Sequence, residues 1–284
     1  MTISERAVVF SCVGEQLLGI VTQPELAGHT GVLIIVGGPQ YRVGCHRQFL
    51  LLSRALAAAG YPAMRFDYRG MGDSTGDLRT FETVEADIAA AIEAFTAACP
   101  GLQRIVLWGL CDAASASLLY LHAGQDERLG GLVLLNPWVR SETTLARAHI
   151  KHYYLQRVLQ PEFWRKLLSG RLGVGRAVGG LLGNLHRARL AATPASRELT
   201  FQGKMRCALA ESQLPVLLIL SGDDYTAKEF IEITRIDAAW QQVLAQERVS
   251  TREVSDADHT FSSAAWRLAV EEATLAWLQK LTPR

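Results

Sequence analysis

The stretch Ile105-Val-Leu-Trp-Gly-Leu-Cys-Asp-Ala-Ala114 decides how this chain folds. Its first half is apolar and predicts a buried strand, and the small residues after Cys111 predict the start of a helix. A sharp strand-to-helix turn with a reactive side chain at its tip is a nucleophile elbow, usually written G-x-S-x-G. The turn crowds the backbone, so small residues are needed two places before and two places after the tip. Gly109 and Ala113 supply them here, and Cys111 stands at the tip.

Cys111 has two interpretations. At the first turn of a helix, a thiol meets unpaired backbone N–H groups and the positive end of the helix dipole. Both favour the thiolate, which is the nucleophilic form of cysteine. Cysteine is also a common small buried residue, so the elbow alone does not separate a nucleophile from a packing residue.

Composition indicates a globular protein. A chain of 284 residues with 49% hydrophobic residues suffices for one large α/β domain, with or without an inserted lid. The net charge of +1 argues against extensive nucleic-acid binding. Five scattered cysteines predict neither a disulfide framework nor a metal site, and they favour a reducing compartment.

Targeting and cofactor signals are also absent from the sequence pattern. We find no secretory signal at the start and no apolar run of the roughly 18 residues that a membrane helix needs. These observations predict a soluble, cytoplasmic protein. We expect no metal and no nucleotide cofactor, because the glycine-rich segment 170–183 lacks the Lys-Ser/Thr ending of a phosphate-binding loop.

Strand and helix patterns alternate along most of the chain. Residues 6–22 predict an antiparallel hairpin, and further strands are expected at 31–36, 61–68, 104–108, 131–136, 214–220 and 248–254. Helical patterns occupy 49–59, 83–98, a stretch ending near 123, 227–244 and 264–281. This alternation predicts an α/β fold with a mostly parallel, doubly wound sheet.

The pattern is interrupted between residues 138 and 206. This segment lacks a buried-strand signal and carries thirteen lysine and arginine residues against three glutamates. We interpret it as an inserted helical lid on a core formed by 1–137 and 207–284. Its cations either select an anionic substrate or form only a solvated face.

Three reactive residue types follow three different predicted strands. Cys111 comes first, the Asp223-Asp224 pair follows the strand at 214–220, and His259 follows the last strand. The carboxyl ends of parallel strands form the sites of open α/β sheets. We therefore predict a triad of Cys111, His259 and Asp224. Asp223 is the alternative acid, and a solvated loop histidine is the alternative interpretation of His259.

An oxyanion hole requires backbone N–H groups, one of them from the residue after the nucleophile. Asp112 supplies that group. Gly38 or Gln40 supplies the second from the loop after the strand at 31–36, since the intervening proline has no N–H. Four further residues of this loop are candidates for lining the pocket: Tyr41, Arg42, His46 and Arg47.

These features resemble the α/β-hydrolase superfamily over essentially the whole chain. The segment Phe66-Asp-Tyr-Arg-Gly-Met-Gly-Asp-Ser74 is similar to the superfamily's D-x-R-G-x-G-x-S motif, which stabilises the loops beside the site. The chain more specifically resembles the type 1 hydrolase associated with the bacterial exosortase A system. The segments that carry this resemblance are Gly37-Gly-Pro-Gln-Tyr-Arg-Val-Gly44, Trp108-Gly-Leu-Cys-Asp-Ala-Ala-Ser115, Leu135-Asn-Pro-Trp-Val-Arg140, His152-Tyr-Tyr-Leu-Gln156 and Leu220-Ser-Gly-Asp-Asp224. The resemblance implies a link to exopolysaccharide synthesis and PEP-CTERM protein sorting.

A Cys-His-Asp set implies an acyl-cysteine intermediate. Attack by water makes the protein an esterase, thioesterase or lactone hydrolase, and attack by a sugar, alcohol or amine makes it an acyltransferase. Dienelactone hydrolases and polyhydroxyalkanoate synthases, which resemble this arrangement, represent the two outcomes. We expect a small acyl ester or thioester as substrate, either free or bound to a carrier. A non-catalytic scaffold with a hydrolase fold is the third alternative.

Overall fold

The computed structural model describes residues 2–38, 40–124, 126–140 and 199–281. The segments Met1–Val139 and Thr200–Arg284 pack together as one compact unit. The helix Phe201–Glu211, whose first residues belong to the predicted lid, buries Met205, Ala208 and Leu209 against this unit. The predicted lid falls almost entirely on residues 141–198, outside the described part of the chain.

Eight strands form a single sheet in the order β1-β2-β4-β3-β5-β6-β7-β8. The first pairings, β1 with β2 and β2 with β4, are antiparallel, and the other strands run parallel. The strands are β1 (Ile3–Cys12), β2 (Glu15–Pro24), β3 (Thr30–Ile35), β4 (Ala63–Phe66), β5 (Arg104–Leu110), β6 (Leu129–Leu135), β7 (Val216–Ser221) and β8 (Val249–Val254). The predicted α/β-hydrolase sheet and its leading hairpin are confirmed.

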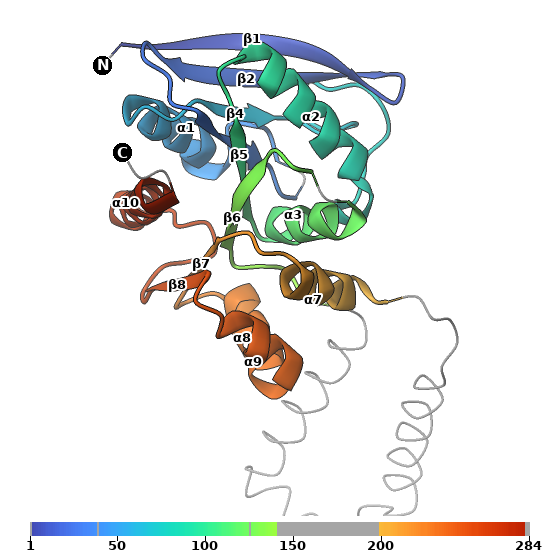
Figure 1. Ribbon diagram of the computed structural model, residues 1–284, viewed down its shortest axis with the longest axis vertical. Helices are drawn as coiled ribbons and strands as arrows, with labels where there is room; N and C mark the ends of the chain where they lie inside the picture. Colours follow the sequence, from blue (N-terminus) through green and yellow to red (C-terminus); the bar gives the residue numbers. More distant parts are fainter. Residues whose placement is uncertain (1, 39, 125, 141–198, 282–284) are drawn as a thin grey trace, which may run out of the picture. The chain divides into compact units, whose positions relative to one another are not determined.

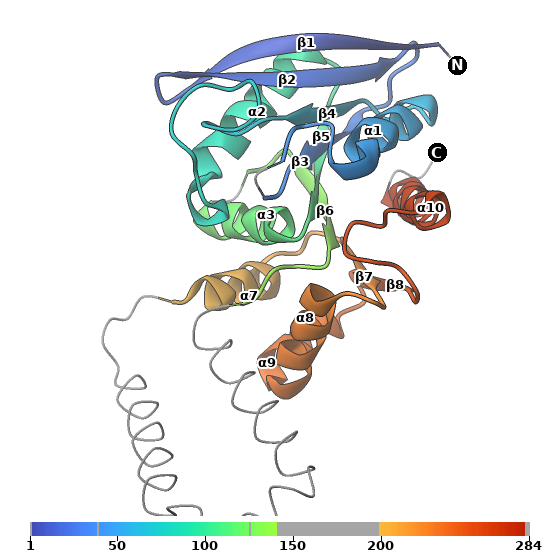
Figure 2. The same ribbon diagram turned by 180° about the vertical axis from the view of Figure 1, so that it is seen from behind.

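Helices cover both faces of this sheet (Figures 1 and 2). They are α1 (Gln48–Ala58), α2 (Glu85–Ala98), α3 (Asp112–Ala123), α7 (Phe201–Glu211), α8 (Tyr225–Ile236), α9 (Ala238–Leu244) and α10 (Ala264–Leu281). One core cluster packs α1 and α10 on the sheet, and a second packs α2, α3, α7, α8 and α9. Strands β3, β4 and β7 are buried along their whole length, because helices lie on both sides of them.

The predicted helix at 227–244 is in fact two helices. Asp237 ends α8 and caps α9, where its Oδ1 accepts hydrogen bonds from the N–H groups of Ala239 (2.9 Å) and Trp240 (3.3 Å). A side chain that satisfies the free N–H groups of a new helix start fixes the break at this residue.

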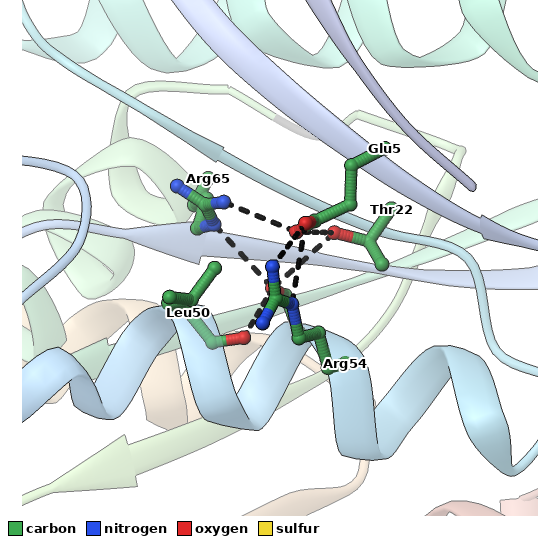
Figure 3. Close-up of polar contacts among 6 residues, drawn as sticks. Glu5, Thr22, Leu50, Arg54 and Arg65 are labelled. Atoms are coloured by element: carbon green, nitrogen blue, oxygen red, sulfur yellow. Dashed lines mark hydrogen bonds and ion pairs between the residues drawn. The ribbon is translucent and has the colours of Figure 1, made fainter. Parts of the chain in front are cut away.

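A polar cluster anchors the hairpin to the rest of the core (Figure 3). The Glu5 carboxylate on β1 accepts hydrogen bonds from Arg54 on α1 and from Arg65 on β4. The hydrogen bond from Arg54 is the main reason that the pKa of Glu5 lies below its ordinary value. Thr22 on β2 donates to the same carboxylate at 3.3 Å. The cluster thus joins the hairpin of β1 and β2 to α1 and β4, which lie further along the chain.

Among the described residues, no helix is long and apolar enough to cross a membrane. The same part of the chain contains no group of three or more histidine, cysteine, aspartate or glutamate residues that could hold a metal ion.

Candidate active site

Cys111 lies at the tip of a strained turn between β5 and α3. Its backbone angles are φ 63° and ψ −124°, in a region that residues other than glycine rarely adopt. A side chain at Gly109 would place its Cβ 2.6 Å from the carbonyl carbon and oxygen of Ala113, so glycine is required there. Ala113 is fully buried, which explains why a small residue follows the tip. The strand, turn and helix expected of a nucleophile elbow are present.

The end of β6 and the segment after it form hydrogen bonds with the elbow. The N–H of Cys111 donates to the carbonyl of Leu135 at 2.8 Å, and the N–H of Trp138 donates to the carbonyl of Cys111 at 3.2 Å. Ser115 on α3 also donates through Oγ to the Trp138 carbonyl at 2.7 Å. These bonds fix the backbone of Cys111 on both sides.

Asp224 and His259 meet beside this turn. Nδ1 of His259 lies 3.0 Å from Oδ2 of Asp224. Asp224 is also the N-cap of α8, where the same oxygen accepts the N–H of Ala227 at 2.9 Å. The neighbouring Asp223 has a side chain that is 82% exposed, and it pairs with Lys228. Of the two candidate acids, the structure therefore brings Asp224 to the histidine.

The charges of this pair stabilise each other. Burial works to raise the pKa of Asp224, but His259 and the N–H of Ala227 outweigh it and hold this pKa below its ordinary value. The Asp224 carboxylate, followed by the Cys111 side chain, raises the pKa of His259 to about 10. Asp224 and Cys111 are thus the two neighbours that favour the protonated imidazole, as a triad requires.

Asn136 is a site residue that our sequence analysis did not assign. Its Nδ2 donates to Oγ of Ser221 at 2.7 Å and to the carbonyl of His259 at 3.3 Å, and its Oδ1 accepts the N–H of Ser221 at 2.9 Å. It is fully buried at φ 43°, which asparagine tolerates better than most residues. Asn136 thus ties the end of β6 to the end of β7 and to the loop that carries the histidine. An asparagine directly after a buried apolar strand was the available signal.

The proposed oxyanion loop differs from expectation in its bonding. The N–H of Gly38 donates to Oδ2 of Asp112 at 2.9 Å. The N–H of Gln40 donates to the carbonyl of Gly38 at 2.8 Å, and its Nε2 donates to that of Gly37 at 2.8 Å. Both predicted second donors are therefore engaged within the protein, Gly38 with the Asp112 side chain and Gln40 with a carbonyl of its own loop. The N–H of Asp112 itself follows Cys111 in the first turn of α3, as expected.

Of the four residues predicted to line the pocket, Arg42 is buried, whereas Tyr41, His46 and Arg47 are exposed. Both the backbone N–H and the guanidinium of Arg42 contact the Asp67 carboxylate. It also pairs with Asp73 at 2.8 Å and lies over the ring of Tyr41. Its charge is therefore used to fasten the loop after β3 to the loop after β4. His46 and Arg47 are exposed, with φ of 52° and 60°.

The segment similar to the D-x-R-G-x-G-x-S motif forms buried ion pairs. Asp67 is fully buried and also accepts the N–H of Asp73 at 3.1 Å. Arg69 donates to the buried Asp87 on α2 through its backbone N–H, Nε and Nη2, with Nη2 2.7 Å from Oδ2. These pairs support the loops beside the elbow, which is the role that the resemblance implies.

Known proteins share this fold. The family model described as "Alpha/beta hydrolase family" matches residues 32–272. The human protein ABHD12B is 34% identical over 82 residues, which are 29% of this chain and only 22% of that protein. The Pyrococcus furiosus esterase Pf2001 aligns with a TM-score of 0.64 at 17% identity, over 98% of this chain and 91% of that one. A thermophilic esterase from Thermogutta terrifontis aligns with a TM-score of 0.59 at 18% identity, over 97% and 99% of the two chains. At these identities the structural likeness establishes the fold.

Proposed function

Because the chain belongs to the alpha/beta hydrolase family, we propose that it hydrolyses a small ester or thioester through an acyl intermediate on Cys111. The observation that supports this best is the position of His259, whose Nδ1 lies 3.0 Å from Oδ2 of Asp224. Cys111, Asp224 and His259 follow the carboxyl ends of strands in one sheet, where α/β folds place their sites.

The first half of the reaction forms the acyl-enzyme. The thiol proton of Cys111 resides on His259, because the pKa of about 10 keeps the imidazole protonated near neutral pH and Asp224 stabilises the imidazolium. Sγ of Cys111 attacks the carbonyl carbon of the substrate, and the N–H of Asp112 faces the developing oxyanion. The tetrahedral intermediate collapses, the bond to the leaving group breaks, and the imidazolium gives its proton to that group. An alcohol or thiol departs and an acyl-cysteine remains.

The second half releases the acid. His259, again neutral, takes a proton from water, and the hydroxide attacks the acyl carbon. The carbon–sulfur bond breaks, and the proton returns from His259 to Sγ. The free acid leaves, so each turnover consumes one water and restores the thiol.

The decisive test measures turnover of p-nitrophenyl esters and acyl-thioesters by wild type, Cys111→Ala and Cys111→Ser. We expect Cys111→Ala to lose about 10³-fold or more in kcat, because removal of a nucleophile leaves only binding and oxyanion stabilisation. Cys207→Ala is the matched control, since this cysteine is also free and partly buried. Unchanged turnover in Cys111→Ala would refute the proposal. Analysis of products with added alcohols or sugars distinguishes hydrolysis from acyl transfer.

We extend the proposal to the class of substrate. The thirteen cations of residues 138–206 favour an anionic acyl donor, such as a thioester on a phosphopantetheine arm. Phosphopantetheine thioesters should then be turned over with a lower KM than neutral esters of the same acyl chain. That advantage should shrink as ionic strength rises. An advantage that salt does not change would argue against this substrate class.

The biological setting rests on sequence segments. The segments around the loop after β3, the elbow and the end of β6 resemble the exosortase A-associated hydrolase, type 1, and we propose the same setting of exopolysaccharide synthesis and protein sorting. Disruption of the gene should alter the exopolysaccharide or the sorted proteins of the host. Wild-type levels of both would contradict this assignment.

A further inference from the structure

The side chain of Asp112 occupies the gap between the elbow and the loop after β3. Asp112 begins α3 directly after Cys111, and its Oδ2 accepts the N–H of Gly38 at 2.9 Å. In the proposed reaction an acyl oxygen lies between the N–H of Asp112 and a donor of that loop. The carboxylate therefore bonds to the group that the sequence predicts as a partner for the substrate.

This carboxylate is closely packed. A Cβ added to Gly37 would lie 2.2 Å from Oδ1 of Asp112 and 2.6 Å from the carbonyl oxygen of Leu110. Oδ1 is buried and has no hydrogen-bond partner among the described residues. A buried carboxylate oxygen without a partner is costly. In this closely packed position, only Oδ2 of the Asp112 side chain accepts a hydrogen bond.

The surroundings of Asp112 act on its pKa in opposite directions. Burial raises the pKa of Asp112, against the opposing effect of the N–H groups of Gly38 and Ala113 and of His259. The buried Tyr68 is another titratable neighbour of Asp112. The hydroxyl of Tyr68 also has no hydrogen-bond partner among the described residues. Burial, then the charges of Asp112 and Asp87, raise the pKa of this tyrosine well above its ordinary value.

We propose that the Asp112 carboxylate competes with the acyl oxygen of the substrate for the N–H of Gly38, and so limits the rate at which Cys111 is acylated. The proposal rests on the proposed function, because it concerns the oxyanion of that reaction. A charged acceptor makes a hydrogen bond about twice as strong as a neutral one. The ionised side chain is therefore the stronger competitor, and a neutral one gives way more readily.

Asp112→Asn and Asp112→Ala test this inference. Acylation of Cys111 by p-nitrophenyl acetate requires oxyanion stabilisation, whereas alkylation by iodoacetamide does not. We expect the ratio of the acylation rate to the alkylation rate to rise about fivefold in Asp112→Asn, and further in Asp112→Ala. The gain of Asp112→Asn over wild type should shrink as pH falls, because the wild-type carboxyl then becomes neutral as well. Asp77→Asn, at an exposed aspartate, is the control for a change in net charge.

The outcomes separate the two proposals. A ratio that is unchanged or lower in both variants overturns the role of Asp112, as does a gain that does not vary with pH. Rapid alkylation of Cys111 without acylation in any variant also overturns it, while leaving the reactive thiol in place. If Cys111 of the wild type is alkylated no faster than Cys45 or Cys207, the proposed function fails, and the inference fails with it.

Discussion

Replacing Asp224 with asparagine tests how strongly the acid controls the histidine. Asp224 is the largest contributor to the raised pKa of His259, which is about 10 against an ordinary 6.5. The variant removes both the charge and the charged hydrogen bond, so we expect the pKa to fall by about 2 units or more. At pH 9 the imidazolium population should then drop from about nine tenths to about one tenth.

The assay is an NMR titration of histidine Cε1–Hε1 groups. The chain has seven histidines, and His259→Gln identifies the resonance of interest. Asp223→Asn is the matched control, because that carboxylate is exposed and pairs with Lys228. A midpoint for His259 near 6.5 in the wild type would refute the reasoning. An equal shift in both aspartate variants would refute it too.

The same pair makes stability depend on pH. The pKa of His259 is higher in the folded chain than its ordinary value, so folding is stabilised fully below about pH 6.5 and this contribution is lost as pH rises toward 10. The difference in unfolding free energy between wild type and Asp224→Asn should therefore be largest near pH 5 to 6. It should be smallest above pH 10, and urea unfolding at several pH values measures it. A difference that grows with pH would contradict this sign.

Three further changes probe the support of the site. Asp67→Ala should lower the free energy of unfolding by about 3–5 kcal/mol, because it removes the fully buried one of the two carboxylates that pair with Arg42. Urea unfolding tests this, and a loss below about 1 kcal/mol would contradict it. Asn136→Asp places a carboxylate oxygen against the carbonyl of His259, where the wild type has a hydrogen bond. We expect kcat to fall about tenfold or more with KM little changed. An unchanged kcat would show that this hydrogen bond does not position the histidine. Gly109→Val should prevent folding of the elbow, because even a Cβ at this position lies 2.6 Å from the backbone of α3. A soluble variant with wild-type circular dichroism and activity would contradict this prediction.

The fold was predictable because its signals are local. Runs such as Val32 to Ile35 are apolar without interruption, which indicates a strand covered on both faces, and β3 is buried along its whole length. The order of elbow, acid and histidine follows from the chain alone. The break at Asp237 was missed because an aspartate inside a helical pattern is either an interior residue or a cap, and only the capped N–H groups distinguish the two.

The parts of the site that escaped prediction depend on contacts between distant segments. Arg42 was expected in the pocket, but Asp67, 25 residues away in sequence, holds its guanidinium. The side chain of Asp112 reaches Gly38, which is 74 residues away. Local patterns carry no information on such pairs, because they arise only when the loops after two neighbouring strands are brought together.

The order of the strands also has a consequence for biosynthesis. Cys111 and His259 are 148 residues apart, and β8 and α10, which flank the histidine loop, are synthesised after the elbow. At typical rates of translation the ribosome takes about 7 to 30 s to cover that distance. During this interval the nascent chain carries the cysteine without its base, and for most of it without its acid as well. Reactivity at the thiol should therefore appear only after the histidine loop and α10 have packed on the sheet, and shorter nascent chains should carry an unreactive cysteine.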